Sequence, residues 1–295
     1  MKKGIKIALA AGVGLCLIGG ILIGVGTSTG GKQALQAQKQ AEIAASTVSL
    51  PKTQIQAYHS MKIDLQVLDL KILPSEDDSY YISYTSSLKN KNPLDYHVEK
   101  DTLTLKENDD TSAYTKLTFF ADDDSDENQI ILYVPANTTV QNSEIVTDCS
   151  DIDFQNITLD QGTITSDSGD LDFEFCSLKN LTLTTDAGDF DTKNSTLATC
   201  SFTLSSGDFS GEKNTYVGKS TFISDDGDIS IEDTPERLQA LTIQADTSIG
   251  DLDFPHFLGF TSKADLQSFH YQSTAETGSL VFQTQSGDIS MEYDD

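Results

Sequence analysis

The second half of the chain repeats one pattern of polar and apolar residues about every 19 positions. A Gly-Asp pair followed by an apolar residue recurs along this region, and Ser150-Asp151 is a degenerate first copy. Successive Gly-Asp pairs are 19, 19, 20, 23 and 37 residues apart, and the last interval is close to two repeats, which predicts that one marker is missing there. The marker glycines are Gly169, Gly188, Gly207, Gly227, Gly250 and Gly287.

Apolar residues occupy even positions within each repeat, counted from the Gly. Such alternation is typical of strands with one buried face, and its constant phase indicates that the repeats stack in register. The set at offset 2 is Ile152, Leu171, Phe190, Phe209, Ile229, Leu252 and Ile289, the set at offset 4 is Phe154, Phe173, Ile231, Phe254 and Met291, and the set at offset 14 is Ile164, Leu183 and Phe202.

The repeat predicts an all-β fold, a parallel β-solenoid (single-stranded β-helix) with about 19 residues per coil over residues 136–295. A sheet of hairpins is the competing fold, but it needs turn signals about every 8 to 12 residues. Each coil is stable only against its neighbours. Each marker Gly is expected to form a corner with a positive φ, and the Asp after it to bond backbone amides of the turn.

Residues 58–135 contain less regular strand-like runs, separated by polar loops such as SLKNKNP and ADDDSDENQ. We interpret them as irregular N-terminal strands that cap the same stack. A separate small β-domain is the alternative.

Two features together resemble a known family. The run QIILYVP, which ends at Val134 and Pro135, is followed after a gap by repeated SGD or GD steps with strands of the L-x-L-x-T type. Over residues 60–293 this succession is similar to the bacterial putative-adhesin domain family of unknown function, β-strand-repeat proteins found beside cell-envelope regulators. The resemblance implies a membrane-tethered, extracytoplasmic β-solenoid. Ser150 and the long interval from 250 to 287 depart from the pattern.

The N-terminal residues predict a membrane anchor. Lys2, Lys3 and Lys6 precede an uncharged, mostly apolar stretch, and some twenty such residues span a bilayer core. The lysines orient the N-terminus toward the cytoplasm. We therefore expect a cytoplasmic tail at 1–6, a transmembrane anchor at 7–27 and a helical stalk or linker at 28–57, with the solenoid outside the cell membrane.

The N-terminal apolar segment has three other possible interpretations: a cleaved signal peptide, a lipoprotein signal and a helix-packing motif. A cleaved signal peptide usually has a shorter apolar region, of about 7 to 15 residues. A lipoprotein signal at Cys16 is disfavoured because Leu15 stands where a small residue is needed. Gly20 and Gly24 form one GxxxG pair, which can pack helices closely. In a glycine-rich span, however, this spacing arises easily by chance.

The charge balance excludes several partners. The chain has 19 Lys and Arg against 46 Asp and Glu, a net charge of −27. Nucleic-acid binding and docking on anionic lipid both need clustered basic residues, so neither is expected. Beyond residue 120 there are 34 acidic against six basic side chains, which places the excess charge in the repeats.

Stacking in register aligns the acidic residues in rows along the solenoid. Like charges one strand apart repel, so solvent or cations must screen them. Calcium takes six to eight oxygen ligands, and the weak calcium candidates are Asp170, Asp189, Asp208 and Asp228. We favour turn-capping aspartates on a solvated acidic face, with no cofactor.

Catalysis is not expected, because the acids repeat evenly and no position stands apart with a distinctive His, Arg or Lys. Cys149, Cys176 and Cys200 lie at different points around the coil, at offsets −1, 7 and 12. Disulfides need Cα atoms within about 7 Å, so we favour buried thiols that fill core positions.

The leading hypothesis is a non-catalytic, membrane-anchored envelope protein whose acidic solenoid is presented to a cell-wall polymer, another cell or an envelope protein. A calcium- or polysaccharide-binding module is the second hypothesis. A carbohydrate-active enzyme, with two carboxylates in one cleft, is the third.

Overall fold

The computed structural model describes residues 47–87, 92–108, 128–136, 138–261, 266–275 and 277–293. The expected cytoplasmic tail, the transmembrane anchor and residues 28–46 of the expected stalk lie outside the described residues. Within the described ranges, no helix has the length and apolar character needed to cross a membrane. Val48–Asp295 forms one compact unit.

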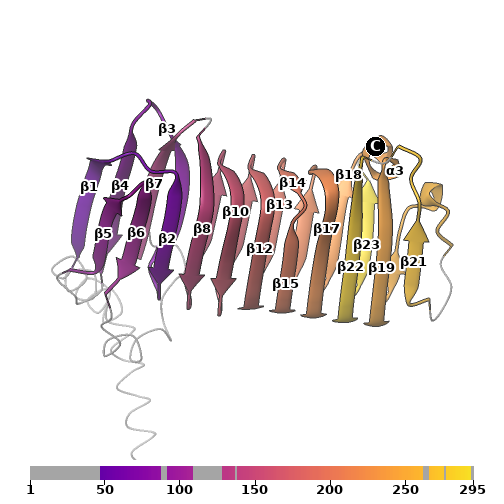
Figure 1. Ribbon diagram of the computed structural model, residues 1–295. Helices are drawn as coiled ribbons and strands as arrows, with labels where there is room; N and C mark the ends of the chain where they lie inside the picture. Colours follow the sequence, from indigo (N-terminus) through magenta and orange to yellow (C-terminus); the bar gives the residue numbers. More distant parts are fainter. Residues whose placement is uncertain are drawn as a thin grey trace, which may run out of the picture. The chain divides into compact units, whose positions relative to one another are not determined.

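Strands from this unit form two long sheets that face each other across a core (Figure 1). In the described residues the first sheet has 11 strands. In spatial order they are β1 (Val48–Ile55), β4 (Tyr80–Ser86), β7 (Asn128–Pro135), β3 (Asp69–Ser75), β9 (Ile152–Gln155), β11 (Leu171–Glu174), β13 (Phe190–Lys193), β16 (Phe209–Glu212), β18 (Ile229–Asp233), β23 (Ile289–Tyr293) and β20 (Leu252–Asp253).

The second sheet has 12 strands in the same described ranges. They are β5 (Leu94–Glu99), β6 (Thr102–Glu107), β2 (Ser60–Leu65), β8 (Thr139–Thr147), β10 (Thr158–Ser166), β12 (Ser177–Ala187), β14 (Thr196–Ala198), β15 (Ser201–Ser206), β17 (Thr215–Asp226), β22 (Gly278–Ser286), β19 (Leu241–Ile249) and β21 (Ser268–Tyr271). Two short helices, α3 (Pro235–Gln239) and η3 (His256–Leu258), lie in the connections.

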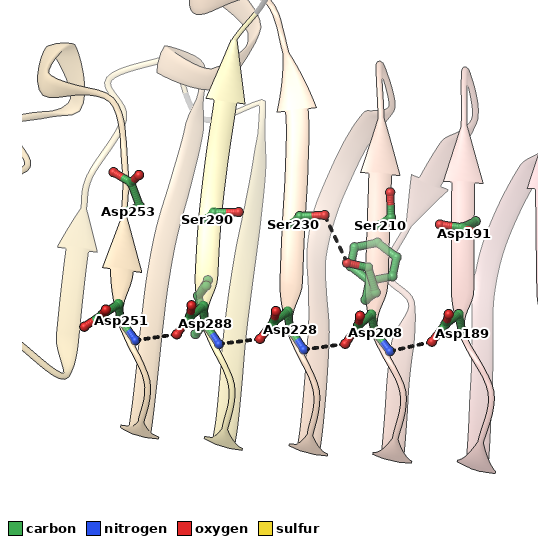
Figure 2. A pocket seen from close by; sticks show the side chains of 12 residues that line it. Asp189, Asp191, Asp208, Ser210, Asp228, Ser230, Asp251, Asp253, Asp288 and Ser290 are labelled. Atoms are coloured by element: carbon green, nitrogen blue, oxygen red, sulfur yellow. Dashed lines mark hydrogen bonds between the residues drawn. The ribbon is translucent and has the colours of Figure 1, made fainter.

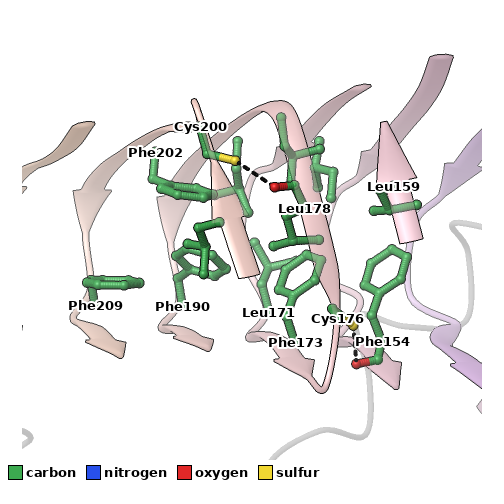
Figure 3. Close-up of a cluster of buried hydrophobic side chains, with 14 of the residues drawn as sticks. Phe154, Leu159, Leu171, Phe173, Cys176, Leu178, Phe190, Cys200, Phe202 and Phe209 are labelled. Atoms are coloured by element: carbon green, nitrogen blue, oxygen red, sulfur yellow. Dashed lines mark hydrogen bonds between the residues drawn. The ribbon is translucent and has the colours of Figure 1, made fainter. Parts of the chain in front are cut away.

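The middle of the unit confirms the predicted parallel solenoid. Phe190 of β13 pairs with Leu171 on one side and Phe209 on the other, each 19 residues away. All the apolar residues predicted at offsets 2, 4 and 14 are buried. Their aromatic rings stack along the core (Figure 3): Phe154 and Phe173 have ring centroids 4.7 Å apart, and Phe190 and Phe209 are 5.2 Å apart.

Two further corners of each coil use residues with a left-handed backbone, which the sequence analysis did not identify. Asn tolerates this conformation because its short polar side chain bonds locally, and Asn is the commonest residue at these corners. One column, with φ between 49° and 55°, is Asn156, Phe175, Asn194 and Lys213. The other, with φ between 51° and 66°, is Asn142, Gln161, Asn180, Thr199 and Gly218.

The last coils do not stack in sequence order. β23, which follows Gly287, pairs with β18 on one side and with β20 on the other. In the second sheet β22 lies between β17 and β19 in the same way. The expected missing marker between Gly250 and Gly287 was therefore wrong. The long interval contains the cap strand β21 and the return of the chain to a level that it had skipped.

The first coil is inserted in a similar way. β2 lies between β6 and β8, and β3 lies between β7 and β9. Residues 60–75 therefore form a coil that is inserted between the pair β6 and β7 and the pair β8 and β9. Residues 58–135 thus continue both sheets, and the alternative of a separate small β-domain was wrong.

The expected stalk extended too far. Val48–Ile55 form the edge strand β1, which pairs antiparallel with β4, so this part of the stalk belongs to the first sheet. Pro51 lies where the register shifts between Leu50 and Thr53. An edge strand tolerates Pro at such an irregularity because no ladder hydrogen bond is lost there.

Replacing Phe190 by Ala should destabilise the solenoid by about 3 to 5 kcal/mol, because the rings of the neighbouring coils cannot close the cavity. Phe175→Ala is the matched control: this side chain is 53% exposed, and the change should stay within about 0.5 kcal/mol. Urea unfolding measures both values. Similar losses for the two variants would contradict the register of the core.

Candidate functional site

The Gly-Asp corners stack so closely that a side chain does not fit. A Cβ on Gly188 would lie 2.3 Å from the carbonyl oxygen of Gly169, and Gly188 has a φ of +117°. Gly227 differs, because its φ is not among the positive values, although a Cβ there would lie 2.0 Å from the carbonyl oxygen of Gly207. The expected positive φ therefore does not hold at Gly227, and close approach of the backbones is the requirement that these corners share.

The aspartate after each Gly bonds to the next coil through its side chain. The backbone N–H of Asp208 donates to Oδ1 of Asp189 at 2.9 Å, and the N–H of Asp228 donates to Oδ1 of Asp208 at 2.8 Å. Figure 2 shows this row of hydrogen bonds, which we name the aspartate ladder. In spatial order its members are Asp69, Asp151, Asp170, Asp189, Asp208, Asp228, Asp288 and Asp251.

A backbone bond completes each link of the ladder. The carbonyl oxygen of Asp208 accepts the N–H of Phe190 at 2.9 Å, while the N–H of Asp208 is bound to Asp189. Each aspartate thus ties its coil to the preceding one with both its N–H and its C=O. A hydrogen bond to a charged acceptor is stronger than a neutral one, about 1.5 to 3 kcal/mol net.

The ladder begins one coil earlier than the sequence indicated. The N–H of Asp151 donates to Oδ1 of Asp69 at 3.1 Å, and Leu68 stands where the regular coils have Gly and the next coil has Ser150. Next to this corner, Oε2 of Glu107 accepts three backbone N–H groups, those of Gln66, Val67 and Leu68, at 2.7 to 3.1 Å. This corner has no Gly-Asp pair. The only signal in the sequence for Asp69 as a ladder member is therefore the alternation of apolar and polar residues at 68–70.

A second row of outward side chains runs parallel to the ladder on the first sheet. Pairing in register gives the order Lys71, Asp153, Asp172, Asp191, Ser210, Ser230, Ser290 and Asp253. Where this row changes from Asp to Ser, a groove of about 610 Å³ opens between the two rows (Figure 2). Aspartates of the ladder line one side of it, and the serines with Asp191 and Asp253 line the other.

Three carboxylates of the second row, those of Asp153, Asp172 and Asp191, have a raised pKa. The pKa of Asp172 is raised to about 6, first by desolvation and then by the negative charges of Asp191 and Asp153. Desolvation is also the main cause that raises the pKa of Asp153 and of Asp191. Desolvation is thus the largest cause in all three, and the charge of Lys71 opposes it at Asp153.

The four calcium candidates, Asp170, Asp189, Asp208 and Asp228, all lie in the ladder. In each of them Oδ1 accepts a backbone N–H from the next coil. Among the described residues, no group of three or more His, Cys, Asp or Glu side chains is arranged to hold a metal ion. The described residues that line the groove include no His, Lys, Arg or Cys.

The family model for Toastrack DUF4097 matches residues 58–292. This chain belongs to the Toastrack DUF4097 family. The match covers the aspartate ladder and the strands of both sheets except β1 and the last residue of β23, and it agrees with the resemblance to adhesin-domain proteins of unknown function found in the sequence.

Solved structures similar to this Toastrack chain have low sequence identity to it. One is described as a putative cell adhesion protein from Clostridium sporogenes, with 11% identity, a TM-score of 0.38, and coverage of 84% of this chain and 99% of the other. Another is described as a putative adhesin from Bacteroides fragilis, with 10% identity, a TM-score of 0.44, and coverage of 83% and 96%. No curated protein matches the chain.

The thiols of the Toastrack chain agree only in part with expectation. Cys176 and Cys200 are buried and free, and burial raises the pKa of Cys176 to about 12. Cys149 is exposed, so the expectation of a buried thiol was wrong there. Cys176 begins an internal polar column that the sequence did not reveal: its N–H donates to Oγ of Ser195, whose N–H donates to Oδ1 of Asn214.

Asp208→Ala should destabilise the Toastrack unit by about 1 to 3 kcal/mol, because the N–H of Asp228 loses its acceptor at a closed corner. Asp208→Asn should cost less, since the amide keeps an oxygen acceptor and removes one charge from the row. Asp186→Ala, at an exposed acid outside the ladder, is the control. Urea unfolding that gave equal losses for Asp208→Ala and Asp186→Ala would exclude a stabilising ladder.

Proposed function

We propose that this chain is a non-catalytic, membrane-anchored, extracytoplasmic β-solenoid that presents an acidic surface at the bacterial cell envelope, as an adhesin-like scaffold. Residues 7–27 hold it in the cell membrane, with the N-terminus in the cytoplasm. The lysines at 2, 3 and 6 before an uncharged apolar stretch support this topology.

The aspartate ladder is the observation that carries the proposal. An enzyme singles out one or two carboxylates with distinct surroundings, whereas here seven aspartate carboxylates accept the same kind of bond along the stack. Each of these seven carboxylates holds the next coil in place. The conspicuous acids are therefore best explained by the architecture, and what they offer to other molecules is a long, regular, negatively charged face.

The descriptions of the solved structures as adhesion proteins apply to those proteins. For this chain, the support for a scaffold comes from its own surface. The partner of such a face is a cell-wall polymer or an envelope protein that carries positive charge or hydrogen-bond donors, because a net charge of −27 repels nucleic acid and anionic lipid.

Protease added to intact cells or spheroplasts should remove the repeats, because the proposed topology places everything after the anchor outside the cytoplasm. The fragments are followed by immunoblotting with an antibody against residues 278–293, and a cytoplasmic protein serves as the intactness control. Deleting residues 7–27 should release the chain from the membrane fraction. Protection of residues 60–295 in intact spheroplasts would reverse the topology.

A calcium- or polysaccharide-binding module is the second candidate, and the groove beside the ladder is the observation that favours it. Its walls supply carboxylate and hydroxyl oxygens at a regular spacing. A cation bound only by the folded state would raise the melting temperature by mass action. Simple screening of the rows responds to any salt.

Thermal unfolding of the full chain in detergent should distinguish these two cases. We expect similar melting temperatures in about 2 mM Ca²⁺, about 2 mM Mg²⁺ and NaCl of matched ionic strength, all above that in EDTA, because the charges are screened without a discrete site. Asp189→Asn and Asp208→Asn are the variants to compare. A calcium-specific rise that both variants lose would favour the binding module over the scaffold.

A further inference from the structure

Residues 277–293 form what we name the closing coil, which comprises β22 and β23. The closing coil lies between two coils that precede it in the sequence: β17 and β18 on one side, β19 and β20 on the other. The chain skips this level after β18, where α3 leads to the following coil, and returns to it after the cap strand β21 (Figure 1).

Without the closing coil, a slot would remain between the coil of β17 and β18 and the coil of β19 and β20. The strands on the two sides of this slot cannot pair with each other. Neighbouring strands lie about 4.8 Å apart, so with one level empty the backbones of β17 and β19 are about twice that distance apart. Both walls then present unpaired N–H and C=O groups. An open pair of strand edges of this kind is a template for an extended segment.

Apolar side chains and one ladder aspartate of the closing coil determine which segment fits the slot. Leu280, Phe282 and Ile289 are fully buried in it. Asp288 joins the ladder on both sides, since its N–H donates to Asp228 and its Oδ1 accepts the N–H of Asp251, both at 2.7 Å. The slot therefore recognises a spaced set of Gly, Asp and apolar residues, with no requirement that the segment belong to the same chain.

The connection to the closing coil is short. It follows β21 at Tyr271, and its described residues, 272–275 and 277, include several that bond to the end of α3 and the start of β19. Oγ of Ser273 donates to the carbonyl oxygen of Gln239 at 2.8 Å, and Oγ1 of Thr277 donates to that of Ala240 at 2.7 Å. These few polar contacts are the interactions that a transfer of the coil would have to give up.

We infer that the slot also accepts the closing coil of a second copy of this chain, so that copies become linked by exchanged coils. Every contact inside the slot is identical in the closed and the exchanged forms, which makes exchange a low-cost route to association. A net charge of −27 per chain makes the acidic faces of two copies repel each other, so a link through the exchanged coil, whose apolar side chains are buried, is favoured over contact between those faces.

The equivalent inserted coil at the other end, β2 and β3, does not offer the same route. It continues into β4 at one side and follows β1 at the other, and both of these strands pair within the first sheet. Moving it would require these strands to separate as well. The inference is therefore specific to residues 277–293.

Disulfide trapping between two copies, each with one introduced cysteine beside the buried Cys176 and Cys200, tests the exchange directly. Ile223 of β17 pairs in register with Gln283 of β22, and neither side chain is buried. One full-length copy carries Ile223→Cys and the other carries Gln283→Cys, both with Cys16 and Cys149 replaced by Ser. The two are unfolded together in detergent and urea, refolded at high concentration and oxidised. Exchange brings the two new thiols together, and a species of twice the chain mass is expected on a non-reducing gel.

The control pair is Thr184→Cys with Thr203→Cys, which are also partners in register on the second sheet but belong to coils stacked in sequence order. It should give no cross-linked species, because those coils are not exchanged. Lys219→Cys with Ser279→Cys is a second exchange pair, should the first disturb folding. The absence of cross-linking in both exchange pairs, or equal cross-linking in the control pair, would overturn the inference.

Discussion

The hydrogen bond from each corner N–H to the aspartate carboxylate of the preceding coil is the interaction on which the rest of the structure depends. In the regular coils, glycine lets successive corners approach within contact of their backbones, as between Gly188 and Gly169. Once the corners are fixed, the apolar residues two and four positions later must stack on their counterparts. The order of the core and the rows of outward side chains both follow from this one link.

The same link explains how a chain this acidic folds. Two carboxylates about 5 Å apart repel by roughly 1 kcal/mol in water. The hydrogen bond that each ladder carboxylate accepts contributes more, about 1.5 to 3 kcal/mol. The balance is less favourable in the second row, where Asp172 lies between two further acids and its pKa is raised. The row changes to Ser at position 210, which ends the run of neighbouring carboxylates within this row.

The sequence predicted the interior of this protein better than its ends. Alternation and a constant interval suffice to place Phe190 under Phe209, because coils in sequence order contact their neighbours at a fixed separation. The level of β23 depends instead on pairing between residues 60 positions apart, and no local pattern distinguishes an insertion from a missing marker. The sequence did not indicate Asp69 as a ladder member for a related reason. Leu68 stands at the glycine position, and Glu107 from another strand completes that corner.

The number of coils in the middle of the stack is independent of the structure of its two ends. Each coil between β8 and β18 touches only the coils before and after it, and the antiparallel strands and inserted coils that finish the stack lie outside this stretch. Duplication or loss of a 19-residue unit there would leave both ends as they are. Genes for such proteins can therefore change the length of the stack in steps of about 4.8 Å, one coil at a time.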